Sequence, residues 1–321
     1  MRIDMHFNGL YWLLRACGLD HKRAEEIARA CQFVDDNKGS LFADYDIKLP
    51  NGYPVETIDT AHHPADVRNL SHWDQVNIWV PFHFLPGLEK DNPLRTVAGK
   101  MPPFSLFKSY DVALGPPFHR LMDTFAHDGF SGVSSEDNLV DQDSLQIFSG
   151  AYGRTEYGRL ADFFRKHTLK VRVMGAVADT FGALGHGGVG TLPDLPYARY
   201  AYETRRDGYP VTIERNNPEI YLKCCDKICL AFGSYLTIPI RDRVKKEILE
   251  RELPDKEDRA ALWNERAPDI FDLPRDNPEY RLPDPDHAPD REFLIKFFRA
   301  ARIARNEILD KWLPANGVYL R

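Results

Sequence analysis

The chain has 321 residues, with a hydrophobic share of 43% and a charged share of 28%. These values are typical of a globular protein that is large enough to bury a substantial core. The formal net charge of −6 argues against a protein that binds duplex DNA by general electrostatics, since that needs a basic face. No apolar run approaches the length of a membrane span, so we expect no transmembrane segment.

The cysteine pattern indicates a reducing environment. The five cysteines, at positions 17, 31, 224, 225 and 229, form no regular framework, and no apolar signal segment follows Met1. We therefore expect a cytoplasmic protein. No Cys-x-x-Cys pair is present, so the three cysteines at 224–229 are interpreted as small core residues of a helix over 220–232.

The chain opens with Asp4-x-His6 and a predicted helix over 10–18. A second helix is predicted over 23–36, with Asp20 as its cap. Asp35 and Asp36 end this helix, and two acids there oppose the helix dipole unless a cation lies nearby. The alternative is a solvated helix end.

Residues 41–57 read as an irregular or short-strand segment, and His62-His63 follows. The aromatic run over 76–85 contains His83. Because the neighbours of His83 supply no second ligand at helical spacing, we predict a pocket-wall or hydrogen-bonded core histidine there and not a metal ligand.

The stretch 118–130 is the first candidate for a reactive site in this sequence. Prolines at 116 and 117 and Gly129 fit the start and end of a helix. In that helix His119, Asp123 and His127 are spaced i, i+4 and i+8, and span an arc of roughly 80°. Two imidazoles and a carboxylate on one face suit zinc or a similar divalent ion. The alternative is that these side chains merely bond one another or solvent.

A long helical pattern is predicted to continue to about residue 181, and a glycine-rich segment over 184–194 follows, with His186 among its glycines. His186 is well placed to join a metal cluster, whereas a phosphate cradle or a simple flexible loop are the alternatives. The basic residues Arg199, Arg205 and Arg206 are candidate anion contacts or a solvated helix face.

The C-terminal part is predicted to be a charged helix over 244–253, a Pro/Asp/Arg-rich arm over 253–289 that is either ordered by contact or partly mobile, and a closing helix over 293–312. We expect an all-α fold in which residues 1–240 form a helical metal-binding catalytic domain. Residues 241–321, the arm and the closing helix, are expected to pack on the same domain.

The candidate ligands form one constellation: Asp4, His6, Asp35 or Asp36, His62 or His63, His119, Asp123, His127, His186 and Asp194. Over residues 1–200 this pattern resembles the zinc-dependent phospholipase C and single-strand nuclease superfamily. The most specific element is His119-x-x-x-Asp123 followed by His127. The resemblance implies a multi-helix bundle that holds up to three zinc ions.

The resemblance also implies a role for each ligand. Asp35, His62 and His119 would bind the first metal, and Asp123 would bridge to the ion of His6. His127 and His186 would bind the remaining ion.

Three features depart from the superfamily's pattern, and one is that the gap of eight residues from His119 to His127 is shorter than the superfamily's usual spacing. The superfamily uses the amino group and carbonyl of an N-terminal tryptophan as ligands, whereas this chain begins Met1-Arg2-Ile3. Either Asp4 replaces that ligand or the site holds two ions. The superfamily also has an acid one turn after the last histidine, where this chain has Gly190, and Asp194 replaces it if the loop folds back.

The expected function is a metal-dependent hydrolase that cleaves a phosphodiester or phosphate ester of a small molecule, lipid or nucleotide through a metal-activated water. The spare carboxylate of the Asp35/Asp36 pair would be the general base. Two alternatives stay open: an iron- or manganese-type metalloenzyme with oxidative or lyase chemistry, and a helical scaffold with a structural metal cluster.

Overall fold

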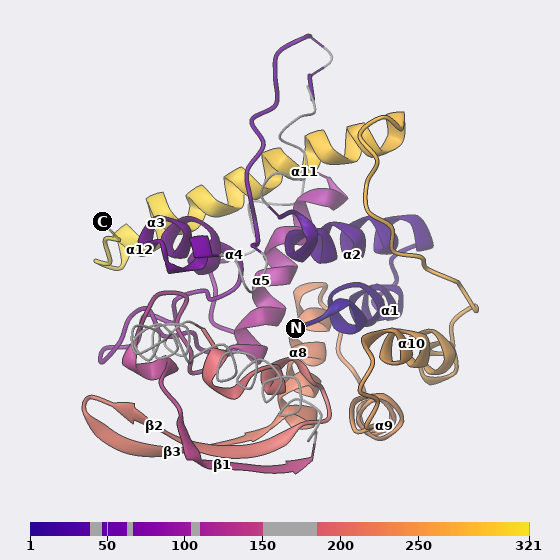
Figure 1. Cartoon of the computed structure of the whole chain (residues 1–321). Coiled ribbons are helices and arrows are strands. Elements are labelled where there is room, and N and C mark those ends of the chain that lie inside the picture. The colour runs from indigo at the N-terminus through magenta and orange to yellow at the C-terminus, as the bar shows by residue number, and fades with distance from the viewer. Residues whose placement is uncertain (39–46, 50, 63–66, 104–109, 150–184, 321) are drawn as a thin grey trace, which may run out of the picture.

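The computed structural model of the chain describes residues 1–38, 47–49, 51–62, 67–103, 110–149 and 185–320 (Figure 1). The long helix predicted up to residue 181 lies outside the described residues. The main helices are α1 (Leu10–Ala16), α2 (His21–Asp36), α5 (Gly115–Ala126), α8 (Asn217–Ala231), α9 (Ile238–Val244), α10 (Lys256–Phe271) and α11 (Ala288–Asn306).

Short helical segments extend or connect these helices. They are η1 (Asp4–Gly9), η3 (Val67–Leu70), α3 (His72–Asp74), η4 (Gln75–Trp79), α4 (Val80–Phe82), η6 (Asp111–Leu114), η7 (Glu136–Asn138), η9 (Gly187–Val189), η10 (Leu192–Asp194), η11 (Lys245–Leu249), η12 (Glu307–Trp312) and α12 (Leu313–Ala315). Several predicted helices are confirmed with small shifts of their ends. In α2, the Asp20 side chain accepts a hydrogen bond from the backbone N–H of Arg23, as predicted for an N-cap.

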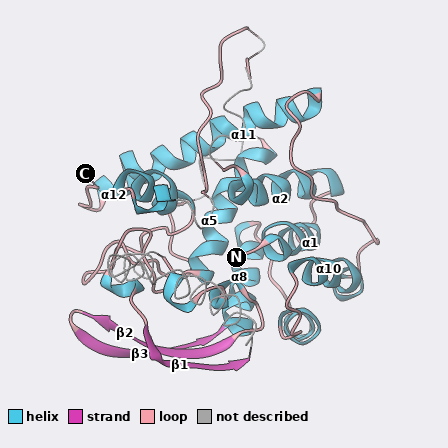
Figure 2. Ribbon diagram, viewed as in Figure 1, coloured by secondary structure: helices cyan, strands magenta, loops and turns pink. Residues whose placement is uncertain are grey.

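The prediction of an all-α fold is wrong, because the structure contains a three-stranded antiparallel sheet in the order β1 (Asp141–Ser149), β2 (Arg199–Arg206), β3 (Tyr209–Asn216) (Figure 2). Strands β2 and β3 form a hairpin in which Tyr202 pairs with Ile213. The turn residues Asp207 and Gly208 both have positive φ, the geometry of a two-residue hairpin turn. The basic residues at 199, 205 and 206 therefore lie on a strand and not on a helix face.

Helix α5 is the centre of the molecule, with the other main helices around it and the sheet to one side (Figure 1). All of its residues are buried. It crosses α2 very closely, because a Cβ on Gly115 would lie 2.4 Å from the Cβ of Ala30 and 2.5 Å from the Ala30 carbonyl carbon. Only glycine permits this approach, which brings the chemistry-bearing face of α5 next to the end of α2.

The apolar core surrounds α5 on several sides. One cluster joins α1, α2, α5, α8 and α10, with Trp12, Leu121 and Trp263 fully buried. A second cluster packs Phe297 of α11 against Phe33 of α2, with ring centroids 4.6 Å apart. A third lies between the sheet and the loops that carry Phe84 and Phe130. Burial on all sides fixes α5 rigidly in place.

Of the two alternatives for the segment 253–289, the structure has the one that is ordered by contact, and it adds a helix that was not predicted. This helix is α10, whose Trp263 is buried in the main core. The extended stretch that follows is fixed to the N-terminal helices, since the Tyr280 hydroxyl donates to Asp36 at 2.7 Å and the Arg15 guanidinium donates to Asp276 at 2.8 Å. None of the helices in the described ranges combines the length and the apolar character that a bilayer span needs.

Candidate metal centre

Imidazole and carboxylate side chains from distant segments converge on α5. The described part of the chain contains three groups of side chains, and within each group the ligand atoms lie within 4.8 Å of one another. The groups are His6, Asp35 and His119; His83, His119 and Asp123; and His127, His186 and Asp194. Segments that are up to about half the chain apart in sequence thus share one cluster.

Asp123 lies in the middle of the cluster and is 1% exposed. Its Oδ1 is 2.7 Å from the α-amino nitrogen of Met1 and 3.1 Å from Nε2 of His6. Its Oδ2 is 3.1 Å from Nδ1 of His83 and 3.1 Å from Nε2 of His119. The two oxygens of one carboxylate therefore face two different sets of nitrogens, which is the arrangement of a bridging ligand.

Asp35 closes the cluster on the side of α2. Its Oδ2 is 3.0 Å from Nδ1 of His6, and its Oδ1 is 3.6 Å from Nε2 of His119. The Asp35 side chain is 28% exposed, more than any other member of the three groups. Solvent therefore reaches the cluster most easily at Asp35.

The third group lies at the other end of α5. His127 follows the last helical residue, and its Nε2 is 3.7 Å from Oδ1 of Asp194. Nε2 of His186 is 3.7 Å from Oδ2 of the same carboxylate. Phe84 stacks on the His127 ring at 4.3 Å, which holds that imidazole in position. The α-amino nitrogen of Met1 lies 3.1 Å from Oδ1 of Asp194 and so connects this group to Asp123.

Backbone carbonyls define which nitrogen of each ring points into the cluster. The pairs are His119 Nδ1 with the Cys31 carbonyl (2.9 Å), His83 Nε2 with Thr60 (2.8 Å), His127 Nδ1 with His83 (2.8 Å) and His186 Nδ1 with Gly190 (2.7 Å). A carbonyl oxygen can only accept, so each of these nitrogens carries the proton. In the neutral ring the other nitrogen then has a lone pair, and in all four histidines that nitrogen faces the carboxylates.

With these tautomers, the inward nitrogens of His119 and His83 are both hydrogen-bond acceptors when the rings are neutral, and they lie close together. Nε2 of His119 lies 3.1 Å from Nδ1 of His83, and both lie 3.1 Å from the same oxygen of Asp123. Lone pairs that face one another and a carboxylate in a buried site repel unless a proton or a cation lies among them.

The electrostatics favour neutral imidazoles at His119 and His186 and an ionised carboxylate at Asp123. Burial lowers the pKa of His119 to about 4, with a contribution from His6, and burial also lowers the pKa of His186 to about 4. Burial alone would raise the pKa of Asp123, but the Met1 amine and the surrounding histidines hold it well below its usual range. Neutral imidazole and ionised carboxylate are the protonation states that bind a metal ion.

Three residues that were predicted as metal ligands or as the general base lie outside the cluster: Asp4, Asp36 and His62. The Asp4 carboxylate accepts from the buried Arg259 guanidinium at 2.9 and 3.3 Å, and this ion pair occupies both of its oxygens. Asp36 points away from Asp35 and accepts from Gln32 at 2.9 Å and from Tyr280. Successive helical residues diverge by about 100°, so only one of the two acids faces α5.

The predicted ligand His62 is engaged elsewhere, since its Nε2 lies 2.9 Å from Oδ1 of Asp74. His83 takes the place next to His119 and Asp123 that the sequence analysis gave to His62. The available signal was a buried imidazole inside an aromatic run, which needs polar partners from elsewhere in the fold. Neighbouring positions in the sequence did not reveal this role, because the partners of His83 come from other segments of the chain. His63 lies outside the described residues.

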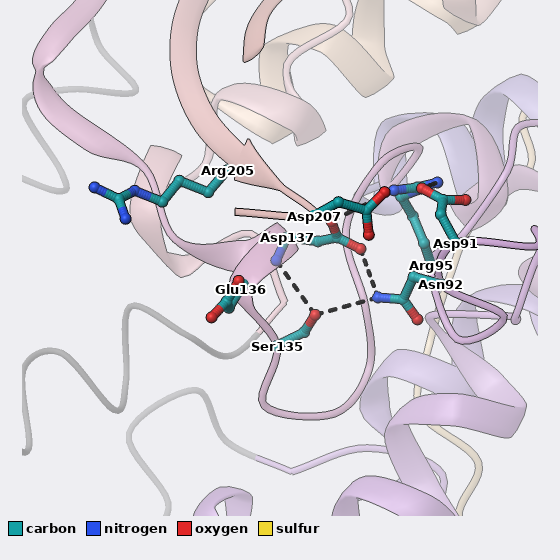
Figure 3. A pocket seen from close by; sticks show the side chains of 8 residues that line it. All are labelled: Asp91, Asn92, Arg95, Ser135, Glu136, Asp137, Arg205 and Asp207. Carbon is teal, nitrogen blue, oxygen red and sulfur yellow. Dashed lines mark hydrogen bonds and ion pairs between the residues drawn. The ribbon is translucent and has the colours of Figure 1, made fainter. Parts of the chain in front are cut away.

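A separate polar cavity of about 230 Å³ shares no residue with the cluster. Figure 3 shows it between the loop of Asp91 and Asn92, the turn of Asp137 and the β2–β3 hairpin. Asp137 accepts from Asn92 at 2.6 Å and from Arg95 at 3.5 Å, and Arg95 also pairs with Asp91. These side chains bond to one another, so they connect the loops around the cavity, and we assign no ligand to it.

The fold and the cluster define a mainly helical protein with a buried imidazole and carboxylate centre suited to divalent cations. The family described as "Family of unknown function (DUF6765)" matches residues 1–293, and the chain belongs to this family. No curated protein and no solved structure matches the chain. The resemblance to the phospholipase C and nuclease superfamily stays a prediction.

Proposed function

We propose that the protein is a metal-dependent hydrolase that cleaves a phosphodiester or phosphate ester. The observation that carries the proposal is the facing pair His83 and His119, whose inward nitrogens lie 3.1 Å apart beside Asp123. The carbonyls of Thr60 and Cys31 take the other nitrogen of each ring, so neither ring can donate a proton to the other without becoming charged. A divalent cation among these atoms would turn the repulsion into coordination.

The donor set favours zinc. Imidazole nitrogens and carboxylate oxygens, without a thiolate, fit zinc, and iron and manganese accept the same donors. The residues that would hold the ions are His6, Asp35, His83, His119, Asp123, His127, His186 and Asp194. Because Asp123 faces two sets of nitrogens and Asp194 faces a third, two or three ions are proposed.

Ions held in this way would lower the pKa of a bound water and stabilise the developing charge of a phosphate ester. The chain itself would orient that water through Asp35, which lies at the most exposed edge of the cluster. His6 holds one oxygen of Asp35 at 3.0 Å and leaves the other oxygen facing His119. Since Gln32 and Tyr280 hold Asp36, we propose Asp35 for the base role, in addition to its place among the residues that would hold the ions.

Turnover of bis(p-nitrophenyl) phosphate, a chromogenic phosphodiester, tests the proposal. Protein stripped with a chelator and reloaded with zinc should hydrolyse it, and Asp123→Asn should reduce the rate at least about a hundredfold. Asp74→Asn is the matched control, because Asp74 is also a carboxylate that pairs with a histidine but lies outside the cluster. Equal rates with and without metal, or an active Asp123→Asn variant, would remove the proposal.

A further inference from the structure

The turn between α8 and α9 presents large apolar side chains to solvent. Leu230, Tyr235 and Ile238 are 62%, 79% and 73% exposed, and Tyr235 is the most exposed large apolar side chain in the described residues. Single exposed apolar residues are ordinary, but three within nine positions of the chain are a local concentration of exposed apolar side chains. We call Leu230, Tyr235 and Ile238 the apolar tip.

The fold holds the apolar tip rigidly. Phe232 stacks on Phe118 of α5 with ring centroids 5.6 Å apart, and Leu236 is 8% exposed. Gly233 has a φ of 70°, and the backbone N–H groups of Phe232 and Ser234 both donate to the Cys229 carbonyl at 3.0 Å. This is a helix end closed by a glycine in the left-handed region. The exposed side chains are therefore presented by a fixed turn.

Cations flank the apolar tip on α8. Lys227 and Lys223 lie about one and two turns before Leu230, and together with it they line a surface groove of about 280 Å³ whose wall includes Phe125. Neither lysine has an ion-pair partner among the described residues. The acid between them, Asp226, is neutralised by Arg241 of α9 at 3.0 Å, and Glu219, one turn before Lys223, pairs with Lys245.

We propose that this surface, the apolar tip with Lys223 and Lys227, docks on an anionic lipid bilayer. Apolar side chains that enter the headgroup region beside unpaired lysines are the combination by which peripheral proteins bind acidic membranes. The chain as a whole has a net charge of −6, so the two lysines give this surface a local positive charge that the rest of the protein does not supply. A stable dimer would need roughly 800 Å² from each partner, far more than three side chains supply.

The inference stands on this surface alone, and it does not depend on the metal centre or on phosphate ester cleavage. Co-sedimentation of the full chain with phosphatidylcholine vesicles, with and without phosphatidylserine, tests it directly. The protein should sediment with the phosphatidylserine vesicles, and added salt should weaken the binding. The Tyr235→Ser/Ile238→Ser double variant should bind at least about tenfold more weakly, because two large apolar anchors are lost.

The matched control is Ile303→Ser/Tyr319→Ser, which removes two other exposed apolar side chains, 50% and 70% exposed. It should bind vesicles as the unaltered protein does. Lys223→Gln/Lys227→Gln should weaken binding to phosphatidylserine vesicles and leave the weaker binding to phosphatidylcholine unchanged.

Three results would overturn the inference. They are no sedimentation with either vesicle, equal binding by the apolar tip variant, and a dimer in light scattering that the apolar tip variant abolishes. Circular dichroism of each variant verifies that it is folded, so a loss of binding is assigned to the surface.

Discussion

Nε2 of His119 and Nδ1 of His83 face each other across 3.1 Å, while the second nitrogen of each ring bonds a backbone carbonyl. Both rings are buried, and burial lowers the pKa of His119 to about 4. At neutral pH His119 is therefore neutral, and its lone pair points at His83 and Asp123. This relationship favours a cation over a hydrogen-bonded network, because the network lacks a donor where the atoms are closest.

Replacing His83 with phenylalanine should change stability in opposite directions with and without metal. In stripped protein the variant should be as stable as the original or more stable, because removal of the repulsive contact with His119 from a buried site outweighs the lost hydrogen bond to the Thr60 carbonyl. With zinc it should be less stable and should bind the ion at least about tenfold more weakly. Thermal unfolding of both proteins, with chelator and with zinc, measures both effects. Equal shifts in the two conditions would show that His83 has no part in metal binding.

Metal removal should lower the thermal stability of the whole protein. Stabilisation by a bound ion is about 2.7 kcal/mol when the free ion is at a hundred times its Kd, which corresponds to several degrees for a chain of this size. A titration with zinc of chelator-treated protein should raise the melting temperature in a saturable way. Magnesium, which prefers oxygen ligands, serves as the control and should not reproduce the effect.

The two acids at the end of α2 should separate in function. Asp35→Asn should reduce hydrolysis of the phosphodiester by about a hundredfold or more, because Asp35 faces the cluster at its exposed edge. Asp36→Asn should leave turnover within a few-fold and lower stability by about 1 kcal/mol, since it weakens the bonds from Gln32 and Tyr280. Loss of activity in the Asp36 variant alone would reverse the assignment of the base.

The close crossing of α5 and α2 should be sensitive to one methyl group. Gly115→Ala places a Cβ 2.4 Å from that of Ala30, so the helices must separate, at a loss of about 1 to 3 kcal/mol in the free energy of unfolding. Because His119 is one turn further along α5, zinc affinity should fall as well. Urea unfolding and a zinc titration measure the two effects, and an unchanged urea midpoint would contradict the tight crossing.

Asp290 should make stability depend on pH below 4. Burial would raise its pKa, but Arg29, Arg281 and the Asp284 N–H hold it at about 2, against an ordinary 3.8. A depressed pKa stabilises the fold above the ordinary value, and this contribution disappears as the pH falls from 3.8 to 2. Asp290→Asn should destabilise the protein by about 1 to 3 kcal/mol at pH 7 and by much less near pH 2. Urea unfolding at the two pH values checks this, and a pH-independent difference would contradict it.

The sequence predicts well whatever depends on neighbouring residues. The spacing of His119, Asp123 and His127 depends only on helical geometry, and the Asp20 cap depends on three residues. The glycine-rich loop brings a carboxylate oxygen of Asp194 to 3.7 Å from Nε2 of His186, and these two residues are only eight positions apart.

The features that could not be predicted from the sequence depend on packing between distant segments. Asp4 was a plausible ligand until Arg259, more than 250 residues away, supplied its counter-charge. His62 and His83 could not be ranked, because the choice rests on how their loops pack against α5. The hairpin of β2 and β3 was missed because aromatic and basic residues at 199–206 obscure its alternation, although Asp207-Gly208 marks the turn.

The most direct test of the central claim is anomalous scattering at the zinc edge from crystals grown with zinc. The account predicts one peak within coordination distance of His83, His119 and Asp123, and further density near His6 or beside His127, His186 and Asp194. Crystals that diffract well, contain zinc in the medium and show no peak at His83 and His119 would contradict it.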